Sequence, residues 1–337
     1  MDAAARRWFD SRTFDSRNFE AGAFDVAALV RAKRCREQSV SVVIPARNEA
    51  ATVGAVVRQI HQALVGPGLV DELLVVDSDS VDGTAREAEA AGATVFAAAG
   101  IPTGTEPSPG KGEALWKSLF VSRGDLIVFI DADLTEWGPH FVTGLLGPLL
   151  RDDATLLVKG FYDRLADDLP GGAQQGQPAT APQGGRVTEL VARPLLNLYW
   201  PQLSAVVQPL AGEWAIRRGL MESLPVPVGY GVEFATLTDT WSRHGLDAIA
   251  QVDLGRRGHR HQNVHDLGVM AAEILATALR RLPGEPPRIA GAGQTLQQYD
   301  RQAPEGWLSR RVPTLERPAA RESPHYRPFP DRSRMDP

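Results

Sequence analysis

Apolar and polar residues follow a repeating strand–helix order over the first half of the chain. The β-branched run at residues 39–45 predicts a buried strand, and apolar residues at 53, 56, 57 and 60 predict a helix over about residues 50–64. The order then repeats, with strands predicted at 73–76, 93–96 and 126–130 and a helix at 84–91. Strands that alternate with helices predict an α/β fold, in which helices flank a mostly parallel central sheet.

The two ends of the chain lack this order. Residues 1–37 are charged and contain the short repeat "FDSRTF", "FDSRNF". We expect an N-terminal extension that docks through its Phe residues and has a helix near residues 26–36. Residues 283–337 are rich in Pro and Arg. We expect a C-terminal helical extension of the fold and, over these residues, a partly ordered tail that could reach a partner subunit. Residues 38–155 and 156–282 would form two halves of one domain.

Two long loops interrupt the pattern, at residues 97–110 and 169–185. The second contains few apolar residues. Loops of this length are typical of functional lids or of disordered segments, and the sequence leaves both readings open.

The bulk composition indicates a soluble cytoplasmic protein. A net charge of −5 argues against nucleic-acid binding. The single cysteine, Cys35, excludes a disulfide framework and fits a reducing compartment. No apolar run has the length of a membrane-spanning helix, so we expect no membrane partner.

Ligands of open α/β sheets bind beyond the carboxyl ends of the strands. Neither a G-x-G-x-x-G motif nor a P-loop follows the predicted strands, which disfavours those two nucleotide sites. The residues that do follow the first two strands are polar: Pro45, Ala46, Arg47, Asn48, Glu49, Asp77, Ser78, Asp79 and Ser80.

Asp131 and Asp133 follow the fourth strand, in "LIVFIDADL". Residues i and i+2 of an extended segment point to the same side, so the two carboxylates could hold a hard cation such as Mg²⁺ or Mn²⁺. The alternative is a strand end with two solvated carboxylates.

Two further segments are candidates for anion binding. Lys111 follows a Pro- and Gly-rich loop and could reach a diphosphate, or it could be a surface lysine. Arg186 follows Gly184 and Gly185 at the start of an apolar helix, where the helix N-terminus favours an anion. The alternative is that Thr188 only caps that helix and Arg186 is solvated.

The segment "GRRGHRHQ" concentrates basic residues, including Arg257, His259 and His261. A histidine here could be a further ligand of the carboxylate-bound metal, with arginines for phosphate, or the segment could be a solvated loop. Tyr230 and Glu233 follow a Pro/Gly turn. Glu233 could contact sugar hydroxyls, act as an acid or base, or only match the helix dipole.

Taken in order, these segments resemble the glucosyl-3-phosphoglycerate synthases, which are retaining glycosyltransferases with the GT-A fold. The segments are "VVIPARNEAATV", "VVDSDSVDGT", "GKGEALWKSL", "VFIDADL", "GGRVTELVARPLL", "QPLAGEWA", "GYGVE" and "HRHQ". The resemblance implies Mg²⁺- or Mn²⁺-dependent transfer of glucose from UDP-glucose to the 2-hydroxyl of D-3-phosphoglycerate by a homodimer.

The resemblance also implies site residues. For the donor they are Pro45, Ala46, Arg47, Asn48, Glu49, Ser78, Lys111, Asp131, Ala132, Leu210, Tyr230, Glu233 and Arg257. For the acceptor they are Gly185, Arg186, Val187, Thr188 and His261. Asp133 and His259 would bind the metal. Glu233, Asp133 and Arg186 are the candidate catalytic residues.

Three alternatives remain at this stage. The first is the same enzyme with mannose as the donor sugar, since the related mannosyl-3-phosphoglycerate synthases use GDP-mannose. Where the family has Asn and Arg after the His-Arg pair, this chain has His261 and Gln262, which leaves the donor open. A nucleotidyltransferase would need a glycine before the first helix, which "PARNEAAT" lacks. A non-catalytic nucleotide-sugar sensor would not need an ordered acceptor site.

Overall fold

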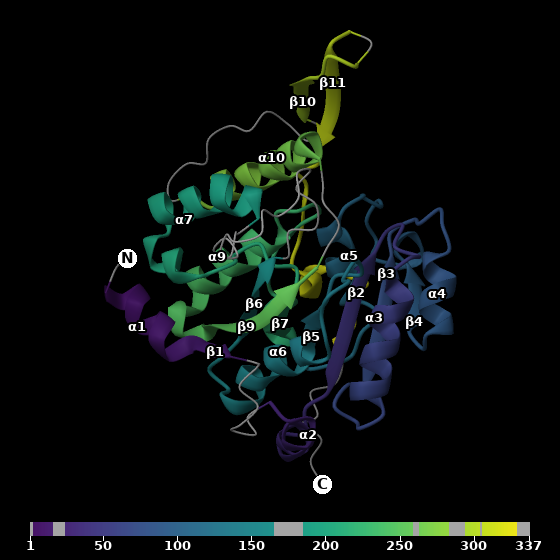
Figure 1. Ribbon diagram of the computed structural model, residues 1–337, viewed down its shortest axis with the longest axis vertical. Helices are drawn as coiled ribbons and strands as arrows, with labels where there is room; N and C mark the ends of the chain where they lie inside the picture. Colours follow the sequence, from purple (N-terminus) through teal and green to yellow (C-terminus); the bar gives the residue numbers. More distant parts are fainter. Residues whose placement is uncertain are drawn as a thin grey trace, which may run out of the picture.

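An eight-stranded sheet with the order β1-β9-β6-β7-β5-β2-β3-β4 forms the centre of the molecule (Figure 1). The computed structural model describes residues 3–15, 24–164, 185–258, 263–282, 294–303 and 305–328. β7 is antiparallel to β5 and β6, and the other neighbouring pairs are parallel. The predicted mostly parallel sheet is therefore confirmed. Its strands are β1 (Thr13–Asp15), β2 (Val40–Ala46), β3 (Glu72–Asp77), β4 (Thr94–Ala97), β5 (Leu126–Phe129), β6 (Leu157–Arg164), β7 (Trp214–Arg217) and β9 (Ile249–Arg257).

Helices cover both faces of the sheet, because successive strand residues point to opposite sides. In β2, Val42 and Ile44 join one buried cluster and Val43 joins the other. The first cluster is covered by α2 (Val26–Cys35), α3 (Val53–Ile60), α4 (Thr84–Ala90) and α6 (His140–Arg151). The second is covered by α1 (Ala3–Arg12), α5 (Lys111–Ser118), α7 (Arg193–Tyr199), α9 (Val232–His244) and α10 (Val264–Arg280).

Shorter elements connect these layers. They are η2 (His61–Val65), η3 (Ala98–Gly100), η4 (Thr188–Ala192), η5 (Pro201–Ala205), α8 (Arg218–Met221), β8 (Val226–Pro227), η6 (Leu246–Ala248), β10 (Gln294–Tyr299), β11 (Trp307–Val312), β12 (Glu316–Arg317) and η7 (Ala320–Glu322). The helix predicted at 50–64 is α3 followed by the π-helix η2, and the other early elements lie within two residues of their predicted ends.

The N-terminal extension packs on the domain through α1 and also adds a strand. Trp8 of α1 is 3% exposed and donates from Nε1 to the Ile249 carbonyl at 2.8 Å. Phe9 and Phe14 pack against the two buried clusters, and Phe19 lies outside the described residues. β1 extends the sheet by pairing in parallel with β9, which the sequence analysis did not predict.

The described C-terminal residues contain strands. β10 and β11 form a hairpin that projects beside α10 (Figure 1). β12 pairs with β8, and Arg317 forms an ion pair with Glu113 at 2.7 Å. The Trp116 indole donates to the Pro318 carbonyl at 2.9 Å. Much of the segment predicted as a tail therefore packs on α5 of its own chain.

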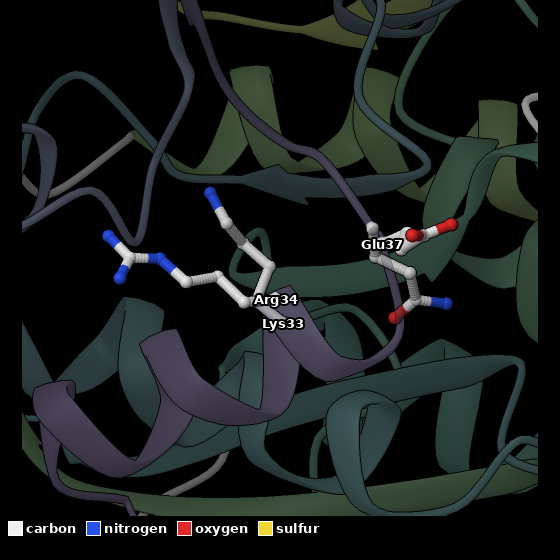
Figure 2. A pocket seen from close by; sticks show the side chains of 4 residues that line it. Lys33, Arg34 and Glu37 are labelled. Atoms are coloured by element: carbon white, nitrogen blue, oxygen red, sulfur yellow. The ribbon is translucent and has the colours of Figure 1, made fainter.

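A surface pocket lies where α2 ends (Figure 2). Glu37 has a φ of +52° and closes the helix, with its N–H bonded to the Arg34 carbonyl and that of Gln38 to the Lys33 carbonyl. Lys33 and Arg34 extend to one side of this turn and Glu37 to the other (Figure 2). Since β2 begins three residues after Glu37, the pocket lies at the amino edge of the sheet, opposite the edge where ligands bind.

No helix within the described ranges is long and apolar enough to cross a lipid bilayer.

Candidate functional site

The two carboxylates that follow β5 share a cation from β9, from which β6 and β7 separate β5 in the sheet. Arg257 is the last residue of β9, and its Nη2 lies 2.9 Å from Asp131 Oδ2 and 3.2 Å from Asp133 Oδ1. Arg257 is buried, whereas the side chains of Asp131 and Asp133 keep 20% and 27% of their surface exposed. The strand end is thus a built ionic site and not two solvated acids.

Lys111 brings a second cation to the same place. It is the first residue of α5, and its Nζ lies 2.7 Å from Asp131 Oδ1 and 2.8 Å from Glu233 Oε1. Glu233 is the second residue of α9 and is almost fully buried. The ends of β5, β9, α5 and α9 therefore converge, and they bring together five of the predicted site residues.

Glycines allow this close convergence. Gly110 has a φ of +136°, a backbone conformation that favours glycine, and a Cβ on Gly112 would overlap the Pro227 carbonyl. The start of α5 can therefore lie directly against residues 227–229, with Lys111 between these two glycines. A Cβ on Gly212 would overlap the Asp131 carboxylate.

Buried groups that the sequence analysis did not select hold Arg257 in place. Glu213 is fully buried, and its Oε2 lies 3.3 Å from Arg257 Nη1, which also donates to the Tyr162 hydroxyl. Lys159 is buried beside them and donates to the Ala211 carbonyl at 2.9 Å. The available signal was a charged residue inside an apolar strand segment, as in "AGEWAI" and "LLVKGF".

The charges at the site are unequally compensated. Burial disfavours charge on Asp131, but Lys111 and Arg257 outweigh it and hold the pKa of Asp131 well below its usual range. Burial and the neighbouring Asp131 raise the pKa of Asp133. Burial also lowers the pKa of Lys159 to about 8. A cation added beside Asp133 would therefore favour the charged form of its carboxyl group.

A pocket adjoins this cluster at the ends of β2 and β3. Arg47, Ser78 and Asp79 line one part of it, and residues 107–110 line another. Asn48 has a φ of +57°, and hydrogen bonds of 2.9 Å tie it to Ser80 and Val81. The polar turns after β2 and β3, from Pro45 to Glu49 and around Ser78, thus form one connected surface next to Lys111.

The remaining predicted residues lie on separate segments. Gly185 to Thr188 lead into η4, with Arg186 exposed and both Val187 and Thr188 buried. Leu210 packs against the core, Ala132 is buried between the two aspartates, and Tyr230 is 38% exposed just before α9. His259, His261 and most of the loop at 169–185 lie outside the described residues.

The described part of the site offers hard oxygen donors for a metal. Within it, no group of three His, Cys, Asp or Glu side chains is arranged to hold an ion, and the predicted ligand His259 is not among the described residues. The carboxylates of Asp131 and Asp133 fit Mg²⁺ or Mn²⁺ by their chemistry.

Comparison with known proteins places this geometry in a family. The model of glycosyl transferase family 2 matches residues 41–191. The chain is 48% identical over 281 residues to the glucosyl-3-phosphoglycerate synthase of Mycolicibacterium paratuberculosis, which covers 83% of this chain and 82% of that protein.

Two crystal structures of the glucosyl-3-phosphoglycerate synthase from Mycobacterium tuberculosis are also similar, both with a TM-score of 0.74. One, 43% identical, holds Mn²⁺, UDP-glucose and phosphoglyceric acid, and the match covers 88% of this chain and 94% of the other. The second, 42% identical, holds Mn²⁺, UDP and glucosyl-3-phosphoglycerate, with 88% and 95% covered. The resemblance seen in the sequence and the predicted GT-A architecture are confirmed, and this chain belongs to the glucosyl-3-phosphoglycerate synthase family of glycosyltransferases.

Proposed function

We propose that this protein transfers glucose from UDP-glucose to the 2-hydroxyl of D-3-phosphoglycerate with retention of configuration. The observation that carries the proposal is the ionic cluster of Lys111, Asp131, Asp133, Glu233 and Arg257 beside a pocket lined by Arg47 and Ser78. Relatives of this fold have been crystallised with this donor, this acceptor and this product.

In this proposal the nucleotide sugar lies across the carboxyl edge of the sheet. The turn from Pro45 to Glu49 and Ser78 hold the uridine, and Lys111 and Arg257 face the diphosphate. Leu210, Tyr230 and Glu233 contact the glucose. Two observations support this order: Gly110, which precedes Lys111, lines the pocket, and Lys111 pairs with Glu233 at 2.8 Å.

Asp133 and His259 would hold Mg²⁺ or Mn²⁺, and the oxygen donors of the Asp131–Asp133 pair suit such a cation. When bound, the metal would stabilise the negative charge that develops on the leaving UDP. The chain itself adds two fixed cations, Lys111 and Arg257, to the same edge.

Glu233 is poorly placed to act as a nucleophile. Its Oε1 is paired with Lys111 at 2.8 Å, so its charge is already compensated. We therefore favour attack of the acceptor hydroxyl on the same face from which the diphosphate departs, with the departing phosphate taking the hydroxyl proton. A glycosyl group trapped on Glu233 would contradict this mechanism.

The acceptor would be held by Gly185, Arg186, Val187, Thr188 and His261. Arg186 can bind phosphate or carboxylate with two parallel hydrogen bonds, and it orients the hydroxyl that attacks. An enzyme in which Arg186 is replaced by alanine should still bind the donor but lose turnover. A nucleotide-sugar sensor would keep both its binding and its output.

The test is nucleotide release by the purified protein with Mg²⁺ and D-3-phosphoglycerate. UDP-glucose, GDP-glucose and GDP-mannose are offered in parallel, with and without the acceptor. Acceptor-dependent release from UDP-glucose is the expected result. Release from GDP-mannose alone would move the protein to the mannosyl branch and make His261 and Gln262 the next residues to exchange.

We also propose that the protein is a homodimer in the cytoplasm. Exposed apolar side chains gather on α7, α10 and the β10–β11 hairpin, and they include Leu198, Tyr199, Leu275, Tyr299 and Trp307. Such side chains are typical of an interface between copies. The single exposed thiol of Cys35 suits a reducing compartment.

Analytical ultracentrifugation tests the dimer. Trp307→Ser combined with Tyr299→Ser should shift the protein to monomer. The control is Val81→Ser, which removes an even more exposed apolar side chain from the turn before α4. A wild-type monomer at micromolar concentration would refute the dimer.

A further inference from the structure

The turn Gly229-Tyr230-Gly231 joins two parts of the site. Tyr230 projects from it, and α9, which carries Glu233, begins immediately after it. On one side the turn contacts the start of α5. The Glu113 N–H donates to the Val228 carbonyl at 2.8 Å, and that of Gly112 to the Gly229 carbonyl at 3.3 Å.

On its other side the turn contacts α10. Glu273 Oε2 accepts a hydrogen bond of 2.6 Å from the Tyr230 N–H. The Glu273 carboxylate also fills the space that a Cβ on Gly229 would need, and the Thr277 hydroxyl fills that of a Cβ on Gly231. Glu273 and Thr277 are four residues apart, so they lie on the same face of the helix.

Glu273 is an expensive residue to bury. It is 4% exposed, and among the described residues no cation forms an ion pair with it. Burial raises the pKa of its carboxyl group to about 7, against which the Tyr230 N–H acts weakly. Burial of a carboxyl group without an ion pair costs free energy. Stabilisation by charge pairing therefore does not explain why Glu273 stands at this position.

We infer that Glu273 is a positioning residue for the donor sugar: with Thr277 it clamps the Gly229–Gly231 turn and so fixes Tyr230 and the start of α9. This inference rests on the proposed function, in which Tyr230 and Glu233 contact the glucose. The clamp acts through the backbone, and neither Glu273 nor Thr277 lines the pocket assigned to the nucleotide. Loss of the clamp should therefore weaken the binding of UDP-glucose and leave the binding of UDP unchanged.

Calorimetric titration of the full chain with UDP and with UDP-glucose, both with Mg²⁺, tests this. Glu273→Ala should weaken UDP-glucose binding about 10-fold, since a buried N–H loses its acceptor, and leave UDP binding within about 2-fold. Glu273→Gln keeps an acceptor oxygen for the Tyr230 N–H and should restore UDP-glucose binding. Gly229→Ala, which displaces Glu273 from the opposite side, should reproduce the selective loss even where Glu273→Ala folds poorly.

Asp239→Asn is the matched control. It removes a partly buried carboxylate of α9 that pairs with Arg281, at the end of α10, at 2.9 Å. It should leave the ratio of the two affinities unchanged. If Glu273→Ala weakened the binding of UDP and of UDP-glucose equally, the clamp alone would be overturned. The same holds if Glu273→Gln did not restore UDP-glucose binding. A wild-type protein that binds UDP but not UDP-glucose would overturn the proposed function and the clamp with it.

Discussion

The Lys111 ammonium group lies 2.8 Å from Glu233 Oε1, in a position where the Glu233 side chain is only 4% exposed. The same ammonium group contacts Asp131, and the two carboxylates raise the pKa of Lys111 well above its ordinary value in spite of its burial. One lysine thus compensates the acid that follows β5 and the acid at the start of α9 at once.

Replacing Lys111 by methionine should damage both activity and stability. The change keeps the length of the side chain but leaves Glu233 buried without its cation, which costs about 3 kcal/mol of unfolding free energy. Turnover should fall at least about 100-fold, because a fixed charge facing the diphosphate is lost. Steady-state kinetics and urea unfolding measure the two effects. Lys111→Arg, which keeps the charge, should recover most of the stability, and a Lys111→Met protein as stable as wild type would refute the pairing.

The metal requirement should depend on Asp133 more than on any other described carboxylate. Asp133→Asn should raise the Mg²⁺ concentration needed for half-maximal turnover about 100-fold or abolish turnover, because it removes one of the two carboxylate charges that would hold the cation. Initial rates over a Mg²⁺ titration measure this. For the wild type, a chelator should remove activity and added Mg²⁺ or Mn²⁺ should restore it. An unchanged metal titration in Asp133→Asn would contradict the assignment.

Stability should fall between about pH 4.5 and pH 7 through Glu273. Its pKa is raised from 4.5 to about 7 in the folded protein, so in this range the folded state holds a proton that the unfolded state has lost. Binding more protons in the folded state means that stability decreases as pH rises. Glutamine does not titrate in this range. The free energy of unfolding of Glu273→Gln should therefore exceed that of the wild type by about 1–3 kcal/mol at pH 8, with little difference near pH 4.5.

Urea unfolding at four pH values between 4.5 and 8 measures this difference. The control is Glu89→Gln, a change at an exposed position of α4. Its free energy of unfolding should equal that of the wild type at each pH. Parallel curves for the wild type and Glu273→Gln would show that Glu273 is ionised at neutral pH in the folded state without penalty.

The N-terminal helix should contribute to global stability. Trp8→Ala should lower the unfolding free energy by about 3–5 kcal/mol, because it empties a buried site and leaves the Ile249 carbonyl without its donor. Arg6→Ala on the exposed face of α1 should change it by less than about 0.5 kcal/mol. A loss below about 1 kcal/mol in Trp8→Ala would mean that α1 does not dock on β9.

The sequence predicted β2, β3, β4 and β5, the helices α3 and α4 between them and the polar residues at their ends, because these depend on local periodicity. It did not predict β6, β7 or β9, which lie in the second half of the sheet. It could not predict β1, since a three-residue strand has no periodicity of its own and exists only because β9 offers a free edge. The same limit applies to Glu213 and Glu273. Each stands in an apolar segment, and only the tertiary fold shows that Glu213 meets Arg257 and that Glu273 meets the Tyr230 N–H.

The site residues fall into two groups on the same principle. Lys111, Asp131, Asp133, Glu233 and Arg257 could be chosen from their positions at the ends of elements, and the structure brings them together. The roles of Arg186, His259 and His261 rest on the family resemblance and stay predictions.

The ion pair between Arg317 and Glu113 has a consequence for how the protein is made. Glu113 is 2% exposed and lies two residues from Lys111, yet the arginine that compensates it is 204 positions further along the chain. During synthesis α5 is complete long before its partner emerges, as β1 is complete long before β9. A nascent chain therefore holds β1, and the helix that carries Lys111, without their final contacts until most of the chain has been made.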